Sequence, residues 1–117
     1  MSTHDESLAA LTATRALIAQ GWTQGASWRK VDGVMCHCLT AAAMTAESHM
    51  SASHWDGKGA FESIARLIIL ERYDSIGDES DFTDPFQIIA EWNDTPGRTQ
   101  EEVLALIDRA IAAQVAP

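Results

Sequence analysis

The sequence predicts an all-α fold: a compact single-domain bundle of about five helices, with a turn near residues 28–35 that could form a short β-hairpin. Three observations support this class. A chain of 117 residues has room for one modest core. Its apolar fraction of 46%, with 7 Gly and 3 Pro, is typical of a folded globule. Several segments repeat apolar residues at the spacing of amphipathic helices. We therefore expect residues 1–117 to form a single helical domain.

The first helix is expected over residues 5–20. Asp5 or Ser7 is of the type that caps a helix N-terminus, and Gly21 is typical of a helix end. At about 100° per residue, one face carries apolar residues that Trp22 would extend: Leu8, Leu11 and Ile18.

Arg15 falls within this apolar face. Its guanidinium would either extend to the edge of the face or pair with a partly buried carboxylate. Asp94 is the candidate partner.

Turn-forming residues follow the first helix. Asp32-Gly33 lies between Arg29-Lys30-Val31 and Val34-Met35, a pattern compatible with a structured loop with little regular pairing or with a short hairpin. A second helix is expected from residue 36 to 48. Its alanines would let another helix approach closely, which predicts a central position.

The third helix is expected over residues 60–73, after a polar connection at 49–59. Five of the six residues from Ala65 to Leu70 are apolar. A helix that is apolar nearly all round belongs in the middle of a bundle. A strand at residues 67–70 is the alternative, but the spacing of the flanking charges favours a helix.

Two further helices complete the prediction. Pro85 is suited to the first turn of a short helix over residues 85–92. Thr99 and Glu102 form the pattern of a capping box at the start of the last helix. That helix carries apolar residues at helical spacing: Val103, Leu106, Ile107, Ala110 and Ile111.

The net charge is −9, from 17 acidic and 8 basic residues, which disfavours binding to nucleic-acid phosphates. Residues 71–94 contain one cation, Arg72, and eight carboxylates. They would form either a solvated loop or a negative face that binds a protein with a basic surface or mimics DNA. The carboxylates are Glu71, Asp74, Asp78, Glu79, Asp81, Asp84, Glu91 and Asp94.

The chain is expected to be soluble and cytoplasmic. No apolar run reaches the roughly 20 residues of a membrane span. The first residues lack the positive patch and apolar core of a secretory signal. Cys36 and Cys38 are too close in sequence to form a disulfide readily, so we expect reduced thiols.

Cys36-His37-Cys38 resembles part of a metal site, but a zinc ion needs four ligands. The remaining histidines, His49 and His54, lack the familiar ligand spacing. On a helix the two cysteines would point about 200° apart. We therefore predict no metal and no cofactor.

Cys36 or Cys38 could supply a cysteine nucleophile, and Cys38 is the candidate catalytic residue. A position at a helix N-terminus would favour its thiolate. A cysteine nucleophile also needs a histidine base and an orienting Asn or Asp. His37, His49 or His54 could supply the first, and Asn93 or Asp94 the second.

Two motifs combine tryptophan with polar residues, and we call them the first (residues 21–25) and second (92–99) tryptophan motifs. In a structural role their indoles fill the edge of the core and their polar side chains fix turns. In a binding role both motifs form one concave patch of convergent donors and acceptors. The candidate binding residues are Trp22, Gln24, Trp92, Asn93, Asp94 and Arg98.

Both motifs carry a family resemblance. Gly21-Trp22-Thr23-Gln24-Gly25 and Trp92-Asn93-Asp94-Thr95-Pro96-Gly97-Arg98-Thr99, followed by Glu102-Val103, are similar to an uncharacterised family of small bacterial and phage proteins. That family has a Cys-x-x-Gly-Ala element, where Cys38-Leu39-Thr40-Ala41-Ala42 has alanine in place of glycine. The resemblance implies no known activity.

The sequence therefore favours a non-enzymatic protein-interaction or regulatory protein of bacterial or phage origin, with another protein as partner. One alternative is a phage-type inhibitor whose acidic surface mimics nucleic acid. The other is a small hydrolase or transferase that depends on Cys38.

Overall fold

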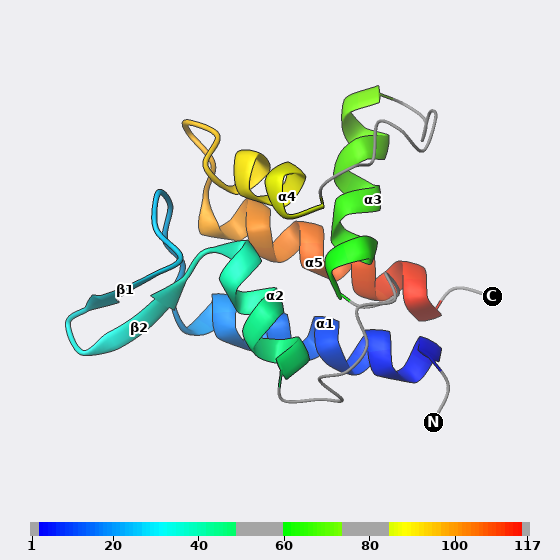
Figure 1. The fold of residues 1–117 in the computed structure, drawn as a ribbon, viewed down its shortest axis with the longest axis horizontal. Coiled ribbons are helices and arrows are strands. Elements are labelled where there is room, and N and C mark those ends of the chain that lie inside the picture. The colour runs from blue at the N-terminus through cyan, green and yellow to red at the C-terminus, as the bar shows by residue number, and fades with distance from the viewer. Residues whose placement is uncertain (1–2, 49–59, 74–84, 116–117) are drawn as a thin grey trace.

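The computed structural model describes residues 3–48, 60–73 and 85–115, which form five helices and one two-stranded antiparallel sheet (Figure 1). The mostly helical fold with a short hairpin is confirmed. In chain order the elements are α1 (Thr3–Gln20), β1 (Trp28–Val31), β2 (Val34–His37), α2 (Leu39–Ser48), α3 (Ala60–Tyr73), α4 (Pro85–Asn93) and α5 (Gln100–Val115).

The core lies between the five helices. α1 packs against α2 and α5, and α3 contacts all four other helices, as its apolar sequence predicts. Leu70 nevertheless stays 40% exposed on α3. Among the described residues, no helix combines the length and the apolar character that crossing a membrane requires. The largest fully buried apolar side chains are Leu11, Ile18, Leu39, Ile64, Ile68, Ile89, Val103, Leu106 and Ile107.

The predicted start of the first helix is wrong. α1 begins at Thr3, two residues before the predicted start, so Asp5 and Ser7 both lie inside the helix. Ser7 is buried there. The predicted end is confirmed, because α1 ends at Gln20 and the Gly21 N–H donates to the Leu17 carbonyl at 3.3 Å.

Arg15 pairs with Asp108, and the prediction of Asp94 as its partner is wrong. The Nε of Arg15 lies 2.6 Å from Oδ1 of Asp108, because α1 runs beside α5. This hydrogen bond, and then the Asp108 charge, raise the pKa of Arg15 above its ordinary value. The guanidinium extends to the partly exposed edge of the α1–α5 pair. This is the first of the two alternatives for Arg15, extension to the edge of the apolar face.

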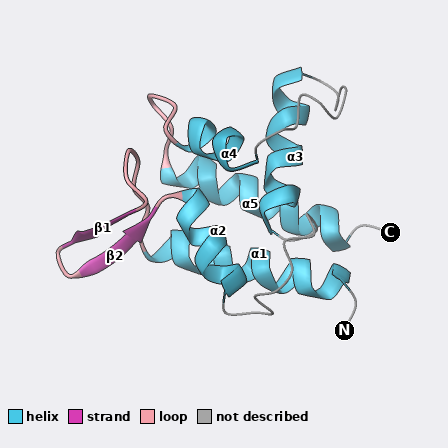
Figure 2. Ribbon diagram, viewed as in Figure 1, coloured by secondary structure: helices cyan, strands magenta, loops and turns pink. Residues whose placement is uncertain are grey.

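The hairpin is regular, and it displaces the predicted start of the second helix. Asp32 and Gly33 have φ angles of 51° and 80°, which suit a two-residue type I′ turn. Pairing then runs from Val31↔Val34 to Trp28↔His37. Residues 36–37 therefore belong to β2, and α2 begins at Leu39 rather than at residue 36 (Figure 2).

The predicted capping box is confirmed at the start of α5. The Thr99 N–H donates to Oε1 of Glu102 at 3.0 Å, and the Glu102 N–H donates to Oγ1 of Thr99 at 3.2 Å. α4 begins at Pro85, as predicted, and ends one residue later than predicted, at Asn93. The turn between α4 and α5 therefore runs from the end of α4 at Asn93 to the capping box at the start of α5.

Candidate functional site

The two tryptophan motifs lie side by side, although about 70 residues separate them in sequence. The Trp22 Nε1–H donates to Oδ1 of Asn93 at 2.7 Å. The Gln24 side-chain amide donates to two main-chain oxygens, of Asn93 at 2.8 Å and of Thr95 at 3.0 Å. The loop after α1 is therefore joined directly to the turn between α4 and α5.

Asn93 is the centre of this network, and its side chain is completely buried. Besides the bond from Trp22, its Oδ1 accepts one from the Leu39 N–H at 3.0 Å. Its Nδ2 donates to the Thr23 carbonyl at 3.2 Å and to Oδ1 of Asp94 at 3.0 Å. A side-chain amide offers two lone pairs and two hydrogens, so all four are used within the protein.

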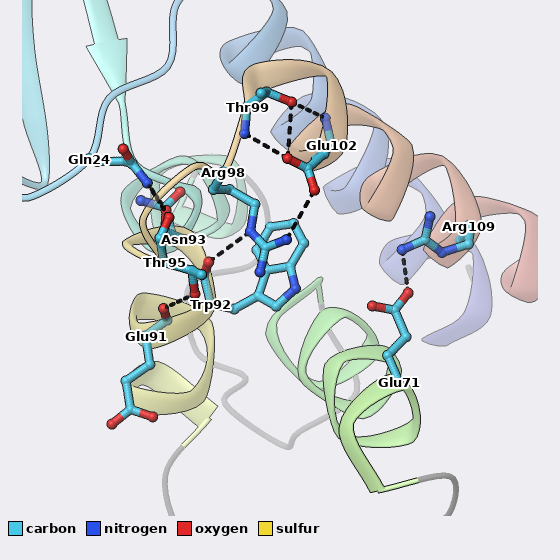
Figure 3. A network of polar contacts seen from close by, with 10 residues as sticks. All are labelled: Gln24, Glu71, Glu91, Trp92, Asn93, Thr95, Arg98, Thr99, Glu102 and Arg109. Carbon is cyan, nitrogen blue, oxygen red and sulfur yellow. Dashed lines mark hydrogen bonds and ion pairs between the residues drawn. The ribbon is translucent and has the colours of Figure 1, made fainter.

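Arg98 fixes the second motif from the other side (Figure 3). Its guanidinium carbon lies 3.8 Å from the centroid of the Trp92 ring, and its Nε donates to the Trp92 carbonyl at 3.0 Å. Its Nη1 forms an ion pair with Glu102 at 3.2 Å. The hydrogen bond from the Thr99 main chain holds the pKa of Glu102 below its ordinary value, aided by the Thr99 hydroxyl and by Arg98.

Asp94 also joins the loop after α1 to the turn between α4 and α5. Its Oδ1 accepts a hydrogen bond from the Gly25 N–H at 3.0 Å, in addition to the one from Asn93. The structure thus brings together all six candidate binding residues. The polar atoms described here are aimed at one another and at the main chain. Chemically, the arrangement fastens two loops, and a role in ligand binding stays a prediction.

An open pocket of about 440 Å³ adjoins the network, and Cys38 lies in its wall. Cys38 immediately precedes α2, and its Sγ accepts a hydrogen bond from the Ala41 N–H at 3.3 Å. The thiol therefore caps the N-terminus of α2, in the manner of a serine or aspartate at this position. The pocket is lined by Gly25, Ala26, Ser27, Cys38, Thr40, Gln87, Ala90, Asn93 and Asp94.

The residues described do not assemble the predicted cysteine–histidine pair. Cys38 is 9% exposed, and no described histidine forms a hydrogen bond with its sulfur. His37 is the neighbouring residue on β2, and its buried Nδ1 has no hydrogen-bond partner in the described structure. The other candidate bases, His49 and His54, lie outside the described residues.

The two cysteines have separate environments. Cys36 packs against Gly21, where an added Cβ would lie only 2.6 Å from its Sγ, whereas Cys38 faces the pocket. Within residues 3–48, 60–73 and 85–115, no group of three or more His, Cys, Asp or Glu is arranged to hold a metal ion.

Most of the predicted acidic face also lies outside the described residues, namely the five carboxylates between residues 74 and 84. Of the other three, Glu71 forms an ion pair with Arg109, and Asp94 belongs to the network around Asn93. Glu91 accepts a hydrogen bond from the Gln87 side chain at 3.1 Å.

The sequence interpretation missed the exposed surface of the hairpin. Trp28, Val31 and Val34 are 61%, 47% and 41% exposed. The two strands extend from the edge of the helical bundle, on the side away from α3 (Figure 1). The apolar residues that flank Asp32-Gly33 predicted a turn or a short hairpin, but not that their side chains are exposed.

Comparison with known proteins places this architecture in a family. A family model described as a family of unknown function (DUF6197) matches residues 2–113. No curated protein and no solved structure matches the chain. The prediction of an uncharacterised family is therefore confirmed. Because the match covers nearly the whole sequence, the chain belongs to the family of unknown function DUF6197.

Proposed function

We propose that this is a non-enzymatic protein-interaction or regulatory protein of bacterial or phage origin, and that the hairpin β1–β2 is its contact surface. The observation that carries the proposal is the exposure of Trp28, Val31 and Val34 on one small projecting element. The proposed origin rests on the resemblance of the tryptophan motifs to bacterial and phage proteins.

Exposed apolar groups on a hairpin are informative because single exposed apolar side chains are common, whereas neighbouring ones mark interaction sites. Val31 and Val34 are directly paired across the strands and share one face of the hairpin. Trp28 lies at the other end of β1 and points to the opposite face. Tryptophan is also among the residues that contribute most to protein–protein binding. A partner that contacts both faces of the hairpin would bury all three side chains.

The other surfaces considered support binding less well. The polar groups of the tryptophan motifs are engaged with one another around Asn93. The acidic-mimic alternative depends largely on residues outside the described part of the chain. The cysteine-enzyme alternative has a pocket beside Cys38, but no described base in contact with the thiol.

Capture from a bacterial lysate tests this proposal with matched variants. We expect the full chain to retain a defined set of proteins that the Trp28→Ser/Val34→Ser double variant loses. The control is Met44→Ser, which removes an apolar side chain that is 46% exposed on α2, away from the hairpin. Both variants should unfold at the same denaturant concentration as the native chain.

Equal capture by the native chain and the hairpin variant would reject the hairpin as the contact surface. Capture at high salt distinguishes the acidic-face alternative from binding by the hairpin. About 0.5 M salt screens exposed charges but leaves apolar contacts intact. The apolar contacts of the hairpin should survive this salt, and capture that depends on the hairpin is recognised by its loss in the Trp28→Ser/Val34→Ser variant. Release by salt, together with insensitivity to the hairpin substitutions, would favour the acidic face.

A further inference from the structure

The two edges of the hairpin differ in how much of their main chain is already bonded. Along the outer edge of β2, the His37 N–H donates to the Gly21 carbonyl and the His37 carbonyl accepts from the Thr23 N–H, both at 3.1 Å. The Gln20 side chain donates to the Met35 carbonyl at 3.4 Å. The segment after α1 therefore covers the β2 edge.

Within residues 3–48, 60–73 and 85–115, no strand pairs with the outer edge of β1. In a two-residue hairpin the pair next to the turn is hydrogen-bonded, and bonded and non-bonded pairs alternate along the strands. Val31↔Val34 is that first pair, so Trp28 and Lys30 direct their N–H and C=O groups away from β2. Among the described residues, β2 is the only strand that neighbours β1. The β1 edge thus presents main-chain donors and acceptors in the form that an added strand requires.

The side chains of β1 make this edge both basic and apolar. Trp28 and Lys30 point to one face of the sheet, and Arg29 and Val31 point to the other, because side chains alternate along a strand. All four are exposed. Each face therefore offers one apolar group and one cation, in a chain whose net charge is −9.

From this pattern we propose that β1 accepts an extended segment of a partner protein as a third strand, with the order apolar–acidic–acidic–apolar. The inference rests on the proposed function and adds the chemistry of the partner. The two carboxylates would lie opposite Arg29 and Lys30, and the two apolar side chains opposite Trp28 and Val31. The order reads the same in both directions, so it suits a parallel or an antiparallel strand.

Charge also disfavours a second copy as the occupant. Two-fold antiparallel pairing of β1 with its own copy, centred on the strand, would place either Arg29 opposite Arg29 or Lys30 opposite Lys30, depending on the register. Like charges directly opposite in a sheet are destabilising. An acidic strand instead neutralises them.

The test titrates the ¹⁵N-labelled full chain with the capped peptide Thr-Ile-Glu-Glu-Val-Thr. We expect saturable shifts of the main-chain amides of Trp28 and Lys30 that exceed those along β2. The matched peptide Thr-Ile-Lys-Lys-Val-Thr should produce none. In the Arg29→Glu/Lys30→Glu variant the preference should reverse, so that the Lys-Lys peptide binds and affinity for the Glu-Glu peptide falls by about tenfold or more.

Two further measurements test pairing through the main chain. Lys30→Ala removes the cation and keeps the N–H, whereas Lys30→Pro removes both. That N–H points away from β2, so the hairpin pairing stays intact in both variants, and peptide affinity should fall by about a further tenfold in Lys30→Pro. Methylation of one glutamate N–H in the peptide tests the same bond with the protein unchanged. Only one of the two adjacent glutamate N–H groups can face β1, because successive N–H groups point to opposite edges of a strand. Methylation of that one should abolish binding.

Several results would overturn the inference. One is the absence of amide shifts at residues 28–31 at peptide concentrations up to about 1 mM. That concentration is well above the dissociation constant expected of a functional interaction. Equal binding of the Lys-Lys peptide, or no effect of either glutamate methylation, would also exclude the acidic strand. Concentration-dependent dimers that Lys30→Pro abolishes would assign the edge to a second copy. If the peptide fails but Trp28→Ser/Val34→Ser still loses its lysate partners, the proposed function stands and this inference fails.

Discussion

The indole N–H of Trp22 donates to the side-chain oxygen of Asn93 at 2.7 Å, and this bond ties the end of α1 to the end of α4. The same oxygen accepts from the first N–H of α2, that of Leu39. One buried amide thereby fixes the relative positions of three helices. The polar groups of both motifs that are described here bond to one another and to the main chain, whereas the hairpin carries three of the exposed large apolar side chains among the described residues.

Replacing Asn93 tests this architectural role. Asn93→Leu would remove all four hydrogen bonds of this buried amide, and should lower the free energy of unfolding by about 3 kcal/mol. Trp22→Phe removes a single bond and should cost about 1 kcal/mol. Urea denaturation measures both values. A loss below about 0.5 kcal/mol for Asn93→Leu would show that the network contributes little.

Gly21 should tolerate no side chain as long as Cys36 is present. A Cβ at Gly21 would lie 2.6 Å from the Cys36 sulfur and 3.2 Å from the Met35 carbonyl oxygen. We expect Gly21→Ala to destabilise the fold by about 1–3 kcal/mol. Cys36→Ala removes the closer contact, so the double variant should be more stable than the sum of the single effects implies, by about 1 kcal/mol. Strict additivity in thermal or urea unfolding would contradict this contact.

Cys38 should behave as a helix cap. Serine is a preferred cap, so Cys38→Ser is expected to match the native stability, whereas Cys38→Ala should lose about 1 kcal/mol because the Ala41 N–H loses its partner. Urea unfolding of the two variants gives the comparison. Equal stability of the Ala and Ser variants would argue against a capping role for the sulfur.

The lowered pKa of Glu102 predicts a pH-dependent contribution to stability. The folded state favours its ionised form, so the contribution is present above the ordinary glutamate pKa of about 4.3 and is lost as pH falls through the lower folded value. The stability difference between the native chain and Glu102→Gln should therefore be constant near neutral pH and shrink below about pH 4. Glu101→Gln removes the same charge outside the capping box and serves as the control. A difference that does not change in acid would contradict the prediction.

The parts of the fold that the sequence predicted well are those governed by local interactions. The box formed by Thr99 and Glu102 is complete within four residues, so its pattern sufficed to place the start of α5. The start of α2 depended instead on how far β2 pairs with β1. Likewise, the partner of Arg15 depended on α5 lying beside α1, which no spacing along the chain encodes.

The same distinction holds for the candidate site. The sequence suggested that Trp22 and Asn93 belong to one patch, because each lies in a short motif that combines tryptophan with polar residues. Whether their polar atoms face solvent or each other is a property of the packed structure. The exposure of Trp28 was not predictable either, since the same residue on a packed hairpin would be buried.

The most direct test of the account compares two indole N–H signals in one ¹⁵N-labelled sample, those of Trp22 and Trp28, as a captured partner is added. The account predicts that the Trp28 signal shifts or broadens on binding, while the Trp22 signal, bonded to Asn93, keeps its position. A change at Trp22 with Trp28 unmoved would contradict it, and would return the binding role to the tryptophan motifs.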